Sequence, residues 1–459
     1  MHVQPLRDST AGGTAWKGYE LFVFRVAFIF FVLITVPLDP GYYKLWFTLD
    51  WSKLHIRDMG ALAGRGMHFI SIDSESGNFG LASYIDWFIS LGIGIVGAVV
   101  WGLIDRKTTN YKVLYYFLTA LVSHAMLIKL QGLTFSKVFP SQMPELAMTQ
   151  LNTPFGDFTP QKLYWLQFSF VHGYEIFAGL AELMIMLLLF FRQTRAWGAA
   201  LAIAMVGNIA LANHLYDGGV HVLAMLYFIG GVFVLWRYLP AIWNLIVNEK
   251  DVTPSFYHYP FKKKWEKYLR LAFKTFVFVF FFGVSAYLHW HNYKYDSYKV
   301  PSRPGIAGTR GLYEVTEFRL NNKVIPYSPT DSVRWQNVSF EKWSTLSFSV
   351  FNTFNIHGEA GRGKQFKDVD RTYESAGTGG GRRHYYYEAD SAAGKLVLFN
   401  KNKVYKDERM NLAYSRPTEN RIILSGINET RDSLYIVLDR KDRTYPLYAG
   451  KKQALEFIP

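Results

Sequence analysis

Residues 276–282 read Phe-Val-Phe-Val-Phe-Phe-Phe, at the centre of a mostly apolar stretch from 270 to 290. Seven consecutive aromatic and β-branched side chains suit a lipid environment better than water. A transmembrane helix needs roughly 20 such residues, and six further stretches are long and apolar enough. These are 19–38, 84–104, 113–131, 171–191, 196–215 and 219–238. The sequence therefore predicts a polytopic α-helical membrane protein with about seven transmembrane helices in residues 1–291.

The composition divides the chain into two parts. Of its 459 residues, 19% are charged, which is below the roughly 25% of a typical soluble domain. The long apolar runs end near residue 290, and the remainder has the composition of ordinary polar protein. This split excludes a single soluble globule and a disordered chain. The absence of cysteine excludes disulfides, thiolate metal ligands and cysteine nucleophiles.

The basic residues predict an orientation in the membrane. The net charge is +14, and short loops rich in Lys and Arg face the cytoplasm. Basic residues concentrate in the connections 105–112, 192–195 and 262–267, which share one side if the helices alternate. We therefore expect a cytoplasmic N-terminus and an outer location for everything after residue 291. Contact of these loops with anionic lipid explains the charge, so we expect membrane lipid and no nucleic acid as a partner.

One outer loop carries a further structural prediction. Residues 132–170 contain four X-Pro pairs, which predict short broken helices resting on the membrane face. Such caps often roof a pocket that lipid can reach.

The C-terminal part is predicted to be a β domain. Residues 292–310 form a linker, and apolar and polar residues alternate in several short segments after it. They are 312–320, 343–351, 384–388, 395–399, 421–424 and 433–438. This pattern predicts an antiparallel barrel or sandwich over 311–459, loosely similar to a lipocalin-type barrel. The Gly- and Arg-rich residues 357–383 are interpreted as a mobile loop. A phosphate-binding loop is the alternative, but this run lacks the Lys-Ser/Thr ending and the following helix of a P-loop.

Ionisable residues inside membrane helices are costly and usually functional. Arg25 and Glu182 have similar depths, so an ion pair between them is expected. His172, Glu175, Gly179 and Glu182 follow a spacing that covers less than a quarter of a helix circumference. A proton path, a wet pocket and simple helix packing all remain open for this stripe.

A second polar group lies in the hairpin between the fifth and sixth predicted helices. It comprises Asn208, Asn213, His214, Asp217 and His221. Histidine carries protons near neutral pH, so general acid–base chemistry is one interpretation. Hydrogen-bonded hairpin structure is another. A metal held by these residues with Glu175 is a third, but the spacing matches no strong ligand signature, and no metal site is predicted.

Two lysines close the third predicted helix. Lys129 and Lys137 lie at the outer membrane boundary, where a lysine usually snorkels to water. In a dry pocket, a lysine can instead lose its proton and act as a base.

Residues 111–238 resemble the DoxX-like membrane proteins. The resemblance rests on three stretches: the aromatic 115–117 leading to Lys-Val-Phe-Pro at 137–140, Phe-Ala-Gly-Leu-Ala-Glu at 177–182, and Asn208 with the hairpin 213–217. Arg25 also suits this pattern. The resemblance implies a small multi-helix membrane unit, and some members are associated with quinone-coupled oxidation.

The whole layout is more distantly similar to HTTM proteins related to vitamin K-dependent carboxylase. These join a membrane unit to a β-rich outer domain, use a hydroquinone and have a lysine implicated as a base. Lys137 is the better match for that lysine and Lys129 competes with it. The layout also looks like membrane proteins of Bacteroidota-type bacteria, which implies an inner-membrane protein with a periplasmic β domain.

Two functional hypotheses follow. In the first, a quinone such as menaquinone, or another lipid-soluble substrate, binds at the outer face. His172, Glu175, His214 and Lys137 then carry out proton-coupled redox chemistry, with Arg25, Glu182, Asn208, Asn213, Asp217 and His221 in the pocket or proton path. In the second, the protein is a non-catalytic envelope scaffold or accessory subunit whose β domain binds a periplasmic or membrane protein partner. The first requires His172, Glu175 and His214 to converge around a cavity.

Overall fold

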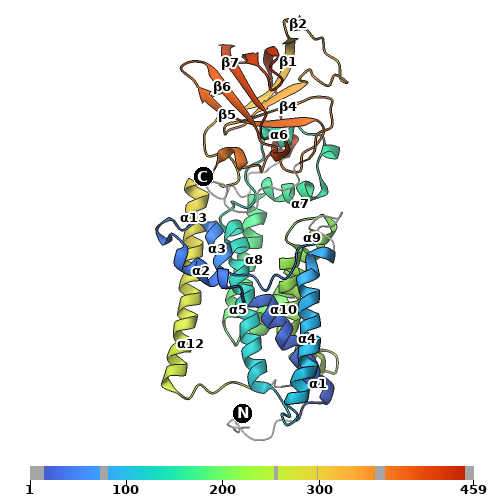
Figure 1. The fold of residues 1–459 in the computed structure, drawn as a ribbon, viewed down its shortest axis with the longest axis vertical. Coiled ribbons are helices and arrows are strands. Elements are labelled where there is room, and N and C mark those ends of the chain that lie inside the picture. Colours follow the sequence, from blue (N-terminus) through green and yellow to red (C-terminus); the bar gives the residue numbers. More distant parts are fainter. Residues whose placement is uncertain (1–14, 73–80, 253–256, 297, 357–366, 450–459) are drawn as a thin grey trace.

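The computed structural model describes residues 15–72, 81–252, 257–296, 298–356 and 367–449. A group of long helices carries a β-barrel at one end, which is called the barrel end below (Figure 1). The opposite end of the helices contains the start of α1 and the end of α4.

Six helical segments are long and apolar enough to cross a membrane. The long helices are α1 (Gly18–Thr35), α4 (Ile85–Ile104), α5 (Lys112–Val138), α8 (His172–Phe190), α9 (Arg195–Leu215), α10 (His221–Trp236) and the continuous α12 (Lys264–Val277) and α13 (Ser285–Tyr295), joined by a π-helical segment. Among the described residues, a seventh span exists only if α10 and α11 (Leu239–Ile246), bent by 69°, count as one. The predicted class of long apolar helices is therefore confirmed for six segments, and a seventh depends on how the bent pair is counted.

Short helices gather at the barrel end. Two follow α1, namely α2 (Pro40–Thr48) and α3 (Ile56–Leu62), and two follow α5, namely α6 (Met148–Leu151) and α7 (Pro160–Ser169). Proline occupies the first turn of α7, and Thr159 caps it by accepting a hydrogen bond from the Lys162 amide. Pro needs no amide partner at that position, so the pair Thr159-Pro160 starts α7. The predicted short helices in 132–170 are confirmed.

The C-terminal domain is a closed antiparallel barrel of eight strands. The strands are β1 (Gly311–Leu320), β3 (Asn337–Phe340), β4 (Thr345–Ser349), β5 (Arg382–Asp390), β6 (Lys395–Asn400), β7 (Arg409–Thr418), β8 (Arg421–Ile427) and β9 (Ser433–Lys441), with a short β2 (Lys323–Val324) paired to β1. Each strand pairs with the next, and β1 pairs with β9 to close the barrel. The structure thus selects the barrel over the sandwich. A short helix, α14 (Pro446–Ala449), follows β9.

Side chains fill the barrel interior. Trp335 stacks on Phe348 with ring centroids 3.7 Å apart, and Phe348 stacks on Tyr385. Apolar residues from every long strand complete this core, among them Val315, Phe340, Leu398, Leu412, Leu424 and Ile436. The barrel is therefore a packed domain rather than a ligand-holding calyx.

The segment after α5 joins the helices to the barrel. The Glu341 carboxylate accepts hydrogen bonds from the amides of Met148 (2.6 Å) and Thr149 (2.8 Å) at the start of α6. Burial raises the pKa of Glu341 to about 7, against the effect of these two donors. The barrel is thus held to the helical domain by buried polar contacts.

The predicted mobile loop is wrong over its second half. Residues 371–378 are all buried. The Gly377 carbonyl accepts from the Thr159 amide at 3.0 Å, and the Gly379 amide donates to the Asp157 carbonyl at 2.7 Å. A Cβ on Gly380 would lie 2.2 Å from Asp157 Oδ2, so glycine serves close packing here rather than mobility. The first part, 357–366, lies outside the described residues.

The linker 292–310 is also packed. Helix α13 continues to Tyr295, and Tyr298 and Val300 are buried. Lys299 Nζ donates a hydrogen bond to the Gln142 carbonyl. The linker is therefore a structural part of the contact between the two domains.

Lys162 gives this contact a pH dependence. It is buried between α7 and the barrel, donates to the Tyr373 carbonyl, and burial lowers its pKa to about 7. Between pH 7 and 10.5, the unfolded chain binds more protons here than the folded one, so stability rises with pH. We expect wild type to gain about 2 kcal/mol from pH 7 to 9 relative to Lys162→Met, measured by unfolding in an SDS titration.

The control for this prediction is Lys323→Met, which removes an exposed lysine from β2. It should keep the wild-type pH dependence. Identical pH profiles for wild type and Lys162→Met would contradict the assignment.

Candidate functional site

Two adjoining cavities lie in the helical domain. The first, the barrel-side cavity, has a volume of about 1110 Å³ and is lined by α3, α5, α10, α13 and residues 298–299. Its basic and histidine side chains are Arg57, Arg65, Lys129, His221, His289 and Lys299. The second, the lateral groove, has a volume of about 780 Å³ and runs between α5 and α12. Its lining is mainly apolar, and Figure 1 shows α12 standing to one side of α5.

Lys129 lies on the wall that the two cavities share. Only Ala63 and Lys129 line both of them among the described residues. Lys129 Nζ donates hydrogen bonds to the carbonyl oxygens of Ala63 (3.5 Å) and Gly64. These carbonyls end α3, where the helix dipole favours a cation. No carboxylate among the described residues forms an ion pair with Lys129.

Neighbouring polar residues fix this part of α5 against other helices. Gln131 Nε2 donates to the Met59 carbonyl of α3 at 3.4 Å, and its Oε1 accepts from Ser285 of α13. His289, one turn further along α13, donates through Nδ1 to the Ser285 carbonyl at 2.8 Å. The position of Lys129 is thus set by buried hydrogen bonds on both sides.

Lys137 and Glu182 form a buried ion pair. Gly179 lets α8 approach α5 so closely that a Cβ there would lie 2.6 Å from the Val138 amide nitrogen. Lys137 Nζ donates to the two Glu182 oxygens at 3.0 and 3.1 Å, and neither residue lines a cavity. The expected Arg25–Glu182 pair is wrong, because α1 packs mainly on α4 and α8 packs on α5.

Arg25 has a different set of partners. Its Nε donates to the Tyr111 hydroxyl at 2.9 Å, and its Nη2 donates to the Asp105 carbonyl at 3.1 Å. Tyr111 in turn donates to Asp105 Oδ2. Arg25 therefore joins α1 to the connection between α4 and α5, away from the barrel-side cavity.

Glu175 and Lys299 hold the segment that leaves α5. Glu175 is 1% exposed, and its Oε1 accepts from the Met143 amide at 3.2 Å. Lys299 reaches the carbonyl of the preceding residue, Gln142. Burial, together with nearby Arg57, lowers the pKa of Lys299 to about 7. Lys299 lines the barrel-side cavity, and Glu175 does not.

The hairpin residues divide into pairs. His214 Nε2 and the Tyr84 hydroxyl are 2.8 Å apart, and the two rings stack. His221 Nε2 and Ser83 Oγ are also 2.8 Å apart. The His214 and His221 rings lie 5.1 Å from each other, but only His221 lines the barrel-side cavity.

The other predicted residues serve structure or lie at the surface. Asn213 is fully buried, donates to the Ile209 carbonyl at 2.8 Å and accepts from the Val220 amide. Asp217 and Asn208 are exposed. His172 begins α8 and lines neither cavity. The expected convergence of His172, Glu175 and His214 around a cavity is therefore not found.

No metal centre is evident in the described part of the chain, which contains no cluster of three or more His, Asp or Glu able to hold an ion.

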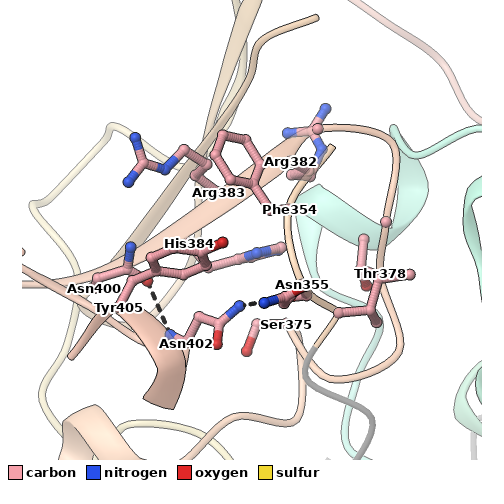
Figure 2. A pocket seen from close by; sticks show the side chains of 13 residues that line it. Phe354, Asn355, Ser375, Thr378, Arg382, Arg383, His384, Asn400, Asn402 and Tyr405 are labelled. Atoms are coloured by element: carbon pink, nitrogen blue, oxygen red, sulfur yellow. Dashed lines mark hydrogen bonds between the residues drawn. The ribbon is translucent and has the colours of Figure 1, made fainter. Parts of the chain in front are cut away.

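A small pocket lies in the barrel domain beside the start of β5 (Figure 2). Its volume is about 30 Å³, enough for about one water. Arg383 lies beside it and is already paired with Glu408 and Glu429, and Arg382 donates to Asn337 Oδ1 at 2.7 Å. Among the described residues that line this pocket, both arginines therefore already have partners.

Comparisons with known proteins are sparse. The chain is 31% identical over 91 residues to the uncharacterized protein YwoB of Bacillus subtilis strain 168. This stretch makes up 18% of the present chain and 59% of YwoB, so the chain spans under two thirds of that relative. No family model and no solved structure matches. The DoxX-like and HTTM resemblances stay predictions.

Proposed function

We propose that the protein binds a lipid-soluble molecule with a polar head, of the quinone class, and exchanges protons with it. The apolar part of the molecule would lie in the lateral groove, and its head would enter the barrel-side cavity beside Lys129. The placement of Lys129 on the wall shared by both cavities carries this proposal. An apolar cavity with a few convergent polar groups is the usual form of a ligand site.

The chemistry of the cavity suits a quinone head. Such a head has oxygen atoms that accept hydrogen bonds and take up protons on reduction. Lys129, His221 and His289 line this cavity, and burial together with nearby Arg57 lowers the pKa of Lys299 to about 7. A group that titrates near neutral pH can both give and take a proton there. Lys129 replaces Lys137 as the candidate base, because Glu182 already pairs with Lys137.

The membrane setting belongs to the same proposal. The short helices at the barrel end and the barrel itself would face the periplasm of a bacterial inner membrane, with the N-terminus in the cytoplasm. The proposal also includes membership of the DoxX-like proteins and menaquinone as the bound quinone. The distribution of Lys and Arg in the connections supports the orientation.

Co-purification tests the ligand. The protein is purified in mild detergent, and the bound lipid-soluble molecules are identified by mass spectrometry. Lys129→Met should reduce the bound ligand at least about tenfold, because a buried charged donor contributes about 1.5–3 kcal/mol. The control, Lys53→Met, removes an exposed lysine of the same end of the molecule and should retain it.

The same experiment tests the alternative function. Aromatic and aliphatic side chains form the barrel core, and His214 and His221 are held in paired contacts. Both features favour a scaffold or accessory subunit. If a protein partner co-purifies in stoichiometric amount and no lipid-soluble molecule is bound, the scaffold function is supported and the ligand proposal is overturned.

A further inference from the structure

The lateral groove has a second polar end, remote from Lys129. The groove follows α5 from Tyr116 to Lys129, which is about 20 Å at 1.5 Å per residue. At its far end, it is lined by Arg192, Arg195, Arg270 and Lys274. The first two come from the turn between α8 and α9. The other two lie one turn apart on the same face of α12.

These four cations have no matching carboxylates. Glu266 is the only acidic residue that lines the groove in the described part of the chain. Its oxygens accept from the Tyr259 hydroxyl (3.4 Å) and the Lys263 amide (3.3 Å). Lys274 lies over the Phe190 ring at 4.3 Å, within the electrostatic field of the three arginines. Mutual repulsion among the four cations is therefore unfavourable, and a bound anion would relieve it.

Arg195 provides the most direct indication of a ligand. It is 8% exposed, lines the groove, and its Nε has no hydrogen-bond partner among the described residues. A buried guanidinium with an unmet donor is costly. Arginine binds phosphate with paired, charge-assisted hydrogen bonds.

We propose that this end of the groove binds the phosphate of an anionic glycerophospholipid, whose acyl chains lie along the apolar wall between α5 and α12. The charge of the cluster selects the head, and the apolar lining selects a lipid over a soluble phosphate. The site is separate from the Lys129 end and does not depend on the proposed function. The acyl chains and the apolar part of the ligand proposed above would share this groove, so the two ligands would compete for it.

Lipid titration of the full chain tests the proposal. Purified protein is titrated with phosphatidylglycerol or phosphatidylcholine, and bound lipid is counted by native mass spectrometry. Arg195→Gln/Lys274→Gln should weaken phosphatidylglycerol binding about 30-fold, since each basic residue near an anionic head contributes about fivefold. Lys262→Gln/Lys267→Gln removes the same charge from exposed positions outside the groove and should leave binding nearly unchanged.

A second variant keeps every charge. Ala120→Phe fills the apolar wall of the groove and should also displace the lipid, which covers the case in which the arginine variant fails to fold. If both double variants weaken phosphatidylglycerol binding equally, the site is overturned, because the lipid would then respond to overall positive charge and not to the groove. Displacement of phosphatidylglycerol by inorganic phosphate alone, with Ala120→Phe binding normally, would overturn the lipid and leave a phosphate site.

Discussion

Lys137→Met is expected to destabilise the helical domain by about 3–5 kcal/mol, the cost of leaving a buried charge without its partner. Glu182 would lose the amine that contacts both of its oxygens, at a position where only 2% of its side chain is exposed. Close packing at Gly179 leaves little room for water to replace the lysine. Unfolding in an SDS titration measures the loss.

The double variant Lys137→Met/Glu182→Leu is the matched control. It removes both charges, and replacement of a buried pair by apolar side chains is often close to neutral. Recovered stability with the lipid-soluble molecule still bound would assign Lys137 to structure. If Lys137→Met is as stable as wild type, the ion pair is contradicted. If the double variant is stable but loses the ligand, Lys137 belongs to the ligand site.

The long helices could be predicted from the length of their apolar runs, but their ends could not. The third helix was expected to end at 131, and α5 runs to Val138. Polar residues such as Gln131 and Lys137 lowered the hydropathy of its last turns. They are buried because they bond to other helices, which a single segment of sequence does not reveal. In the barrel, β7 was missed although Met410 and Leu412 alternate with polar residues.

The sequence predicts which polar residue types belong to the candidate site, but not the groups to which these side chains bond. Lys129 was recognised as a boundary lysine, but its acceptors are the carbonyls of Ala63 and Gly64, which directly follow α3 and lie 65 or more residues earlier in the chain. Lys299 and His289 were missed because the linker and the last long helix were not expected to reach a cavity. The polar stripe of α8 was found from its spacing. It faces α5 and the segment after it, and only the fold determines that its groups meet Lys137 and Met143.

The second large effect concerns the pair Lys401–Glu374 between the barrel and the segment 371–378. Both side chains are completely buried, with the nitrogen and oxygen 2.5 Å apart. Lys401→Met would leave Glu374, whose Oε2 has no partner among the described residues, supported only by the Trp343 ring nitrogen at 3.4 Å. We expect a loss of about 3–5 kcal/mol, measured by the same SDS titration.

Arg421→Met is the surface control for this prediction. Arg421 pairs with Asp439 at 2.7 Å, but the two side chains are 49% and 31% exposed. Exposed pairs contribute about 1 kcal/mol or less, so this variant should stay close to wild type. Equal losses in the two variants would show that burial does not govern the Lys401 pair.

If Lys401→Met loosens the barrel while ligand remains at Lys129, the barrel acts as a separately folded attachment. If ligand is lost as well, the 141–169 segment couples the barrel to the barrel-side cavity. Gln142 of this segment lines that cavity, and its carbonyl accepts a hydrogen bond from Lys299.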